Sequence, residues 1–208
     1  MITVLSVLRS GGDYDAEWVR KLRDGVGRNL GEHRFACLSD VEVPCERIAL
    51  THDFPGWWSK IELYRPGVII GPTLYVDLDT IITGPLDQLT DLPYEFAMLR
   101  NFNNPDVVGS GVMWFRKPLE GIYEKFLEDQ KRAMEWYDFK GLNGTYVGDQ
   151  SFVFDFLEGK IDRLDRRDIR SYKKHCKNGL PEGTSLVCFH GPPKPTEVHT
   201  EWMKQCWI

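Results

Sequence analysis

Segments typical of buried strands alternate with segments of helical periodicity along this chain. Residues 2–8 form a run of mostly apolar side chains, and residues 34–38 form a second one. Between them, apolar residues recur at helical spacing from Trp18 to Leu30, behind Asp15, which suits the N-cap position. A strand, a helix and a strand in this order favour a parallel pair joined by a crossover helix. The sequence therefore predicts an α/β fold with a mostly parallel sheet flanked by helices.

The remaining segments continue this alternation. The patterns predict strands at 74–76, 96–99, 112–115, 161–164 and 186–189, helices at 57–64, 119–134 and 150–157, and a final helix within 196–208. Residues 166–177 are basic and irregular. With 208 residues, 42% of them hydrophobic, the chain suits one folded domain that spans residues 1–208.

Charge and cysteine content exclude some classes of protein. A formal charge of −5 argues against a surface dedicated to nucleic acid, because neutralising phosphates requires a net basic face. The five cysteines lack the short paired spacing of a zinc site or a redox motif, so free thiols in a reducing compartment are expected. The apolar run at the N-terminus is too short for a signal sequence, and no later run is long enough to span a membrane. We therefore expect a soluble cytoplasmic protein without stable membrane insertion.

Two aspartates stand where the apolar segment LYV ends. Asp77 and Asp79 flank Leu78 in the sequence LYVDLDTII. Two carboxylates this close repel each other, and burying them costs free energy unless a cation or strong donors lie between them. Aspartate is also common in turns that follow strands, so a simple turn is the alternative. Ligands of open α/β sheets bind beyond the carboxyl ends of the strands, which favours a site for Mg²⁺ or Mn²⁺ here.

Polar residues elsewhere are candidates for the same site. His190 opens the sequence HGPPKP, in which Lys194 can meet phosphate, although a histidine that merely ends a strand is the simpler interpretation. Ser110 lies between Gly109 and Gly111, where backbone amides can approach a ligand closely or only form a tight turn. Local sequence does not decide between these alternatives.

Two further candidates belong to predicted helices. Asp149 precedes the helix at 150–157, where it can be an N-cap or a carboxylate that binds a sugar. Lys60 follows two tryptophans in a short helix and is either a phosphate ligand or a solvated lysine. In both cases the structural role is the more common one.

The order of these motifs resembles that of the glycogenin-like glycosyltransferases (glycosyltransferase family 8), which have the GT-A fold and a DxD motif. The resemblance covers most of the chain and is carried by SGGDYDAEWVRKL, WWSKIELY, LYVDLDTII, GSGVMWFRK, GDQSFV and CFHGPPKP. No single segment is specific, but their order is. The resemblance implies a Rossmann-like GT-A sheet and a metal-dependent enzyme. Such an enzyme transfers a sugar from a nucleoside diphosphate, UDP in most of the family, to an acceptor.

The resemblance also implies roles for individual residues. Asp77, Asp79 and His190 would hold Mn²⁺ or Mg²⁺ against the donor diphosphate, with Asp77 also placed to bind the ribose. The implied donor-binding residues are Leu8, Tyr14, Lys60, Asp77, Ser110, Gly111, Gly191 and Lys194. Tyr14 would stack on the nucleobase and the two lysines would hold phosphate charge. Asp149 and Gln150, at the donor sugar, are the implied catalytic residues.

The implied chemistry is the departure of a nucleoside diphosphate, which gains negative charge as its bond to the anomeric carbon breaks. A divalent metal and lysines stabilise such a leaving group. The family transfers the sugar with retention by front-face attack, and no dedicated nucleophile is evident in this sequence. Gly109 stands where the family usually has asparagine, Gly191 is nearer to His190 than usual, and Thr196 replaces a tryptophan.

Other functions fit parts of the pattern. DLDTI also resembles the first motif of haloacid-dehalogenase-like phosphatases, in which Asp77 would be the nucleophile and Asp79 the general acid. That nucleophile normally follows the first strand of its domain, whereas Asp77 lies far beyond the first predicted strand. A noncatalytic module that binds nucleotide sugars is another alternative, against which the intact Asp77, Asp79 and His190 argue. A nucleotidyltransferase would need a glycine-rich loop that LRSGGDY does not supply.

The sequence leaves the acceptor open. Trp57, Trp58 and Trp136 are expected to be exposed and could stack on a sugar ring, although burial is the more common fate of tryptophan. A glycan, a lipid-linked glycan, a protein, a metabolite and modified DNA are all candidates. Only the basic segment 163–177 supports DNA, and such a segment is more often a solvated face.

Overall fold

The elements below come from a computed structural model, which describes residues 1–142 and 148–208. The strands are β1 (Ile2–Leu8), β2 (His33–Ser39), β3 (Glu46–Ala49), β4 (Thr73–Val76), β5 (Thr80–Ile82), β6 (Phe96–Arg100), β7 (Val108–Phe115), β8 (Asp162–Leu164), β9 (Ile169–Ser171) and β10 (Leu186–Cys188). The α-helices are α1 (Ala16–Asn29), α2 (Glu120–Glu128), α3 (Gln130–Leu142), α4 (Gly148–Phe156) and α5 (Glu201–Cys206). Short helical segments are η1 (Gly56–Tyr64), η2 (Asp87–Leu89), η3 (Tyr172–Cys176) and η4 (Pro195–Glu197). None of the described helices combines the length and apolarity needed to cross a membrane.

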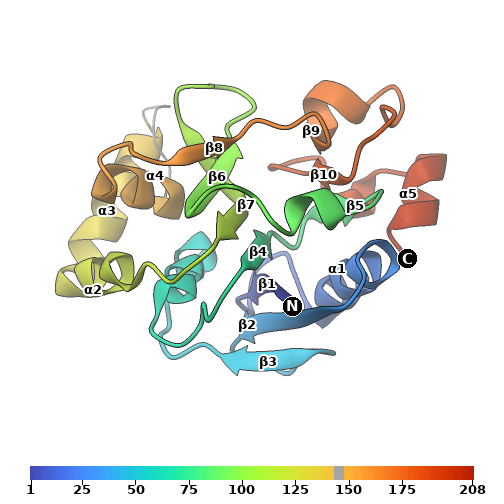
Figure 1. The fold of residues 1–208 in the computed structure, drawn as a ribbon. Coiled ribbons are helices and arrows are strands. Elements are labelled where there is room, and N and C mark those ends of the chain that lie inside the picture. The colour runs from blue at the N-terminus through green and yellow to red at the C-terminus, as the bar shows by residue number, and fades with distance from the viewer. Residues whose placement is uncertain (143–147) are drawn as a thin grey trace.

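Seven strands form the main sheet in the order β3-β2-β1-β4-β7-β6-β8 (Figure 1). β1 pairs in parallel with β2 and β4, β2 with β3, and β6 with β8. β7 alone in this sheet runs antiparallel to its neighbours β4 and β6. Because β7 is reversed, its first residues lie at the edge of the sheet where β1 and β4 end. The predicted mostly parallel sheet flanked by helices is confirmed.

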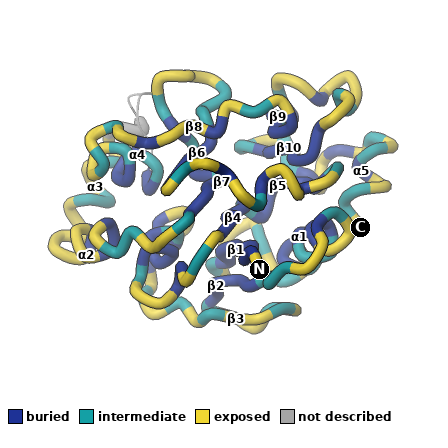
Figure 2. The backbone as a smooth tube through the Cα atoms, in the orientation of Figure 1, coloured by how far each residue is buried: buried dark blue, intermediate teal, exposed yellow. Residues whose placement is uncertain are grey.

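Successive side chains of the central strands enter two different cores, as a pleated strand buried on both faces requires. In β4, Leu74 and Val76 pack in the core that includes α1, whereas Tyr75 packs in the core that includes η1, α2 and α4. A small sheet, in the order β5-β10-β9, contributes to the core on the α1 side. Figure 2 shows the central strands buried and the outer loops exposed. The main sheet is therefore the middle layer of the fold.

Several elements differ from those predicted from sequence. The helix predicted at 119–134 is divided into α2 and α3, because Asp129 has φ −156° and ψ 66°, outside the helical region. Segment 166–177, expected to be irregular, contains β9 and η3. The prediction lacks β3 and β5: β3 is an edge strand with mostly exposed side chains, and β5 has only three residues. Short strands and edge strands leave little hydrophobic pattern to detect.

Gly84 lies at the junction between the end of β5 and the segment that precedes β10. A Cβ at Gly84 would lie 2.9 Å from the backbone oxygen of Thr184, while Thr83 N–H donates to the Ser185 carbonyl at 2.8 Å. We expect Gly84→Ala to lower the free energy of unfolding by about 1–3 kcal/mol, because backbone atoms must shift to admit the methyl group. Urea unfolding measures this loss.

Gly27→Ala is the matched control. Gly27 is exposed on α1, and no atom lies within 4 Å of the position that its Cβ would take. The substitution is expected to be neutral or to stabilise the protein by up to about 1 kcal/mol, since alanine is the better helix former. Equal stabilities of the two variants would contradict the close approach at Gly84.

Candidate functional site

A pocket of about 820 Å³ opens at the edge of the main sheet where β1 and β4 end. Its walls come from the loop after β1, the turn after β4, the start of β7, the end of β10, η1 and α4. The pocket lining includes the predicted site residues Tyr14, Lys60, Asp77, Asp79, Ser110, Gly111, Asp149, Gln150, His190, Gly191 and Lys194. Leu8 differs from them, because its side chain is 1% exposed and packs in the core.

Asp77 is held by neighbours from three elements, two of which contact its carboxylate. Tyr75, two residues earlier in the pleat, donates from its hydroxyl to Asp77 Oδ1 at 2.6 Å. Lys60 Nζ lies 3.1 Å from the same oxygen. The backbone N–H of Asp77 donates to the Gly111 carbonyl at 2.9 Å, which extends the pairing of β4 with β7. These contacts fix the Asp77 carboxylate at the pocket wall.

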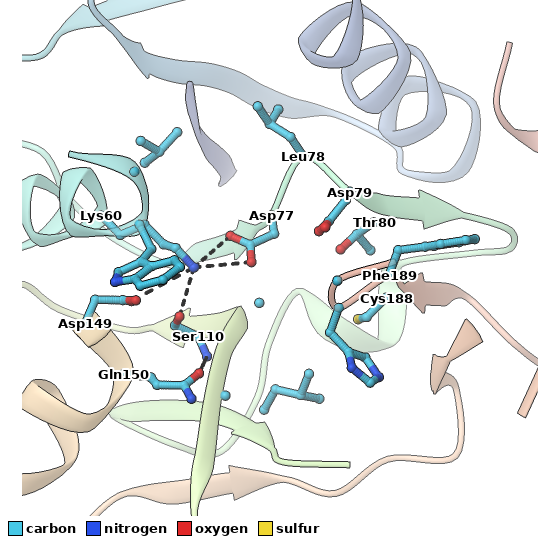
Figure 3. Close-up of a pocket in the computed structure, with 18 of the residues that line it drawn as sticks. Lys60, Asp77, Leu78, Asp79, Thr80, Ser110, Asp149, Gln150, Cys188 and Phe189 are labelled. Atoms are coloured by element: carbon cyan, nitrogen blue, oxygen red, sulfur yellow. Dashed lines mark hydrogen bonds and ion pairs between the residues drawn. The ribbon is translucent and has the colours of Figure 1, made fainter. Parts of the chain in front are cut away.

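Lys60 lies at the centre of a buried polar cluster (Figure 3). Its ammonium group donates to Ser110 Oγ at 2.9 Å and lies 3.9 Å from Asp149 Oδ2. Burial opposes the charge, but the carboxylates of Asp149 and Asp77 raise the pKa of Lys60, so the ammonium stays protonated. Burial raises the pKa of Asp149, whereas the charge of Lys60 lowers it. Gln150 Oε1 accepts the backbone N–H of Ser110 at 3.2 Å.

Asp149 lies inside α4 and is not its N-cap, which was the alternative role expected from sequence. The helix α4 begins at Gly148, which places Asp149 in its first turn, and only 5% of Asp149 is exposed. Its side chain belongs to the pocket lining and faces Lys60. A buried carboxylate opposite a buried ammonium group suits the binding of uncharged hydroxyl groups.

Asp79 lies on the other side of Asp77 from the Lys60 cluster (Figure 3). Its Oδ2 accepts hydrogen bonds from the Tyr14 hydroxyl at 2.7 Å and from Lys194 Nζ at 3.0 Å. Burial and the nearby Asp77 raise the pKa of Asp79, against the lowering effect of Lys194. Burial and the Asp79 charge also raise the pKa of Tyr14, so its hydroxyl keeps its proton. The fold thus joins the loop after β1, the turn after β4 and the C-terminal segment around one carboxylate.

His190 faces a hydroxyl group and an aromatic ring. Its Nε2 lies 2.6 Å from Ser171 Oγ, and its ring stacks on Phe102 with 5.6 Å between the centroids. Burial, together with the charges of Lys173 and Lys174, lowers the pKa of His190. The imidazole is therefore neutral at pH 7, the form in which histidine binds a metal.

The carboxylate oxygens of the pocket suit a hard divalent cation in part. The charged side chains of the pocket lining are four acidic and three basic, Asp13, Asp77, Asp79 and Asp149 against Arg9, Lys60 and Lys194. This excess of carboxylate oxygen favours a cation such as Mn²⁺ or Mg²⁺, whose other positions donor phosphates can fill. Among the residues that the structure describes, no three His, Cys, Asp or Glu side chains lie close enough to hold a metal ion. The two aspartates fit the ion, and the ligand set that includes His190 stays a prediction.

Some pocket residues are missing from the sequence prediction. Arg9 lines the pocket and pairs with Asp40 at 2.5 Å, and the backbone N–H of Ser10 donates to the same carboxylate at 2.9 Å. Arg9 directly follows the predicted strand at 2–8, and this position could have identified it. Ser171 and Phe102, the partners of His190, carry no such signal.

The three tryptophans considered for sugar stacking differ in exposure. Trp58 is 2% exposed, its Nε1 donates to Asp138 Oδ1 at 3.3 Å, and its ring stacks on Phe126. Trp58 is therefore a core residue, and its expected exposure was wrong. Trp57 and Trp136 are 49% and 52% exposed, and of these two only Trp57 lines the pocket.

No protein-family model and no curated protein match this sequence. The structure is nevertheless similar to solved structures of glycosyltransferases. GlyE from Streptococcus pneumoniae TIGR4 matches with a TM-score of 0.63 and 15% identity over 93% of this chain and 55% of GlyE. An active-site variant of LgtC matches with a TM-score of 0.61 and 11% identity, over 93% of this chain and 89% of LgtC.

The bifunctional glycosyltransferase WbbM matches with a TM-score of 0.62 and 12% identity, over 93% of this chain and 46% of WbbM. This chain thus spans about half the length of GlyE and of WbbM. At such low identity the likeness establishes the fold. The chain has the GT-A fold of glycosyltransferases, as its sequence predicts.

Proposed function

We propose that this chain transfers a sugar from a nucleoside diphosphate donor, with UDP as the expected nucleotide, to an acceptor hydroxyl group. The observation that carries the proposal is the pair Asp77 and Asp79, each held beside a lysine at the strand-end pocket of a GT-A fold. LgtC, which shares the fold, is described as a galactosyltransferase in complex with donor and acceptor sugar analogues. An active-site glutamine of LgtC has been changed to glutamate. Gln150 is the residue of this type that lines the pocket here.

In this proposal the nucleotide lies at the Asp79 end of the pocket. Tyr14 stacks on the base, Lys194 holds phosphate charge, and Gly191, with φ +70°, exposes its backbone to the diphosphate. Mn²⁺ or Mg²⁺, held by Asp77 and Asp79 with His190 as the expected third ligand, would neutralise charge on the leaving diphosphate. Leu8, at the end of β1, contributes only backbone.

The donor sugar lies at the Lys60 end, against Ser110 and Gly111. Asp149 accepts hydrogen bonds from its hydroxyl groups, Gln150 donates to them from its amide NH2, and both orient the anomeric carbon. The bond from this carbon to the diphosphate oxygen breaks with its electron pair, and the acceptor oxygen bonds to the same face of the carbon. The acceptor proton passes to the departing diphosphate. Because the new bond forms on the face that the diphosphate leaves, the sugar is transferred with retention and without a protein nucleophile.

The cellular compartment in which the enzyme acts is part of the proposal. All five cysteines are free thiols, and Cys37, Cys176 and Cys188 are buried. Burial raises the pKa of Cys37 and Cys188, which keeps these thiols protonated and unreactive. We retain the prediction of one domain over residues 1–208 that acts in the reducing cytoplasm.

Calorimetric titration with UDP, in the presence and absence of Mn²⁺, tests the function. UDP is expected to bind only when the metal is present, after which UDP-sugars are compared by the UDP that they release. Failure of UDP to bind with Mn²⁺ would refute the proposal. UDP-sugar binding without release of UDP to any acceptor would identify the noncatalytic alternative, and metal-dependent phosphate release without nucleotide binding would favour the phosphatase.

Tyr75→Phe is expected to weaken Mn²⁺ binding in the presence of UDP by about 10–100-fold, because the hydroxyl that orients Asp77 is lost. Tyr64→Phe is the matched control, since Tyr64 is equally buried but donates to Met113 Sδ at 3.5 Å. Manganese titration of both variants measures the difference. Equal affinities in the two variants would show that Tyr75 does not support a metal ligand.

A further inference from the structure

The segment Gly56–Tyr64 places two consecutive tryptophans in opposite environments. Trp58 is buried in the core, whereas Trp57 is 49% exposed and lines the pocket. An indole ring left half exposed keeps a large apolar surface in water, which the fold would otherwise remove. Exposed aromatic surface inside a pocket of hydrogen-bonding residues is typical of a site that receives a ligand with apolar and polar faces.

The ring of Trp57 is held in place by the backbone of α4. A Cβ at Gly148 would lie 2.3 Å from Nε1 and 2.6 Å from Cδ1 of Trp57. Gly148 also has φ +59°, a conformation that favours glycine. The indole therefore rests directly against the Gly148 backbone, and Trp57 lines the pocket beside it. Such a preorganised ring loses little conformational freedom when a ligand stacks on it.

The position of Trp57 selects the part of the substrate that it can contact. It lies on η1 with Lys60, and its contact Gly148 directly precedes Asp149. Lys60, Asp149 and Gln150 lie on one side of Asp77, and Asp79 lies on the other (Figure 3). Trp57 is thus at the sugar end of the pocket, away from the nucleotide end. Ser110 and Asp149 are only 3% and 5% exposed, so the half-exposed Trp57 is further out, at the rim.

We propose that Trp57 is the platform on which a pyranose ring of the acceptor stacks, and that the acceptor is therefore an uncharged sugar or a glycan that ends in one. This inference rests on the proposed function. The C–H face of a pyranose packs on the apolar indole, while its hydroxyl groups remain available to the polar pocket residues. A site at the rim lets the acceptor enter and leave while the donor stays bound.

The test is saturation-transfer NMR with the methyl α- and β-pyranosides of glucose, galactose and mannose, on protein saturated with UDP and the diamagnetic ion Mg²⁺. At least one pyranoside is expected to bind the wild-type protein. Trp57→Ala is expected to weaken that binding by about tenfold or more, by analogy with bases that stack on aromatic side chains. Trp57→Phe is expected to retain part of the affinity, because it keeps an aromatic face.

Trp136→Ala is the matched control, because Trp136 is equally exposed but lies on α3, outside this pocket. It is expected to bind the pyranoside as the wild type does, and all variants are expected to keep the wild-type affinity for UDP. Pyranoside binding that is absent from the wild type, or unchanged in Trp57→Ala, would overturn the inference.

The alternative role for Trp57 is to bind the donor sugar instead of the acceptor. The release of UDP from a UDP-sugar in water, without acceptor, is expected to be unchanged in Trp57→Ala. Loss of this reaction together with donor affinity would assign Trp57 to the donor sugar and refute the acceptor platform. Failure of UDP to bind the wild type would refute the proposed function instead. The same pyranoside comparison without nucleotide would then still decide whether Trp57 binds sugar.

Discussion

Replacing Asp79 with asparagine is expected to weaken Mn²⁺-dependent UDP binding by at least about 100-fold and to abolish sugar transfer. Loss of a group that merely supports a metal ligand already costs about 10–100-fold in metal affinity. Asparagine keeps the size of the side chain and can still accept from Tyr14 and Lys194, the partners of Asp79 in the structure. The substitution therefore removes the charge with little change in packing. Calorimetry with UDP and Mn²⁺ measures the loss.

Asp91→Asn is the matched control for Asp79→Asn. Asp91 also pairs with a basic side chain, Arg116 at 3.0 Å, but its side chain is 85% exposed and it does not line the pocket. Its substitution is expected to leave UDP binding unchanged. Wild-type binding by Asp79→Asn would show that this carboxylate holds no metal.

His190→Ala tests whether His190 is the third protein ligand of the metal ion at this site. In the structure the Nε2 atom of His190 lies 2.6 Å from the Ser171 hydroxyl oxygen. If His190 turns to the metal when the donor binds, its removal is expected to weaken metal-dependent binding as much as Asp79→Asn does. An unchanged affinity would restrict the protein ligands to the two aspartates.

Glu62→Ala is expected to lower the free energy of unfolding by about 3–5 kcal/mol, the range for a buried ion pair that loses one partner. The Glu62 side chain is fully buried. Its carboxylate accepts the backbone N–H of Thr51 at 2.9 Å and of His52 at 2.8 Å, and it pairs with Arg65 at 2.8 Å. Alanine would remove the acceptor of the two backbone N–H groups and the charge partner of Arg65, which keeps its bond to the Ala49 carbonyl. Urea unfolding followed by circular dichroism measures the change.

Glu46→Ala is the control for Glu62→Ala. Glu46 accepts from Arg34 Nε at 2.8 Å, but its side chain is 50% exposed, so its loss is expected to cost less than about 1 kcal/mol. Similar losses for the two variants would contradict the role of burial. Because Glu62 belongs to η1, which also carries Trp57 and Lys60, its loss is further expected to weaken UDP binding.

The sequence by itself determined the class of fold and most of the residues that meet in the pocket. Hydrophobic periodicity reports local structure, so it indicated β1, α1 and β4 near their observed positions. The order of motifs along the chain placed Asp77, Asp149 and His190 among the site residues, and all three line one pocket. These properties are carried by short segments and do not depend on how distant segments meet.

The tertiary structure alone decided which of these residues touch. Lys60, on η1, contacts Asp149 because α4 packs against η1, and it contacts Asp77 at the end of β4. The break at Asp129 and the opposite environments of Trp57 and Trp58 likewise depend on packing between segments far apart in sequence. Local periodicity does not encode strand order or which neighbour covers a side chain. The partners of each site residue, and the exposure of Trp57 at the rim, could therefore be known only from the folded chain.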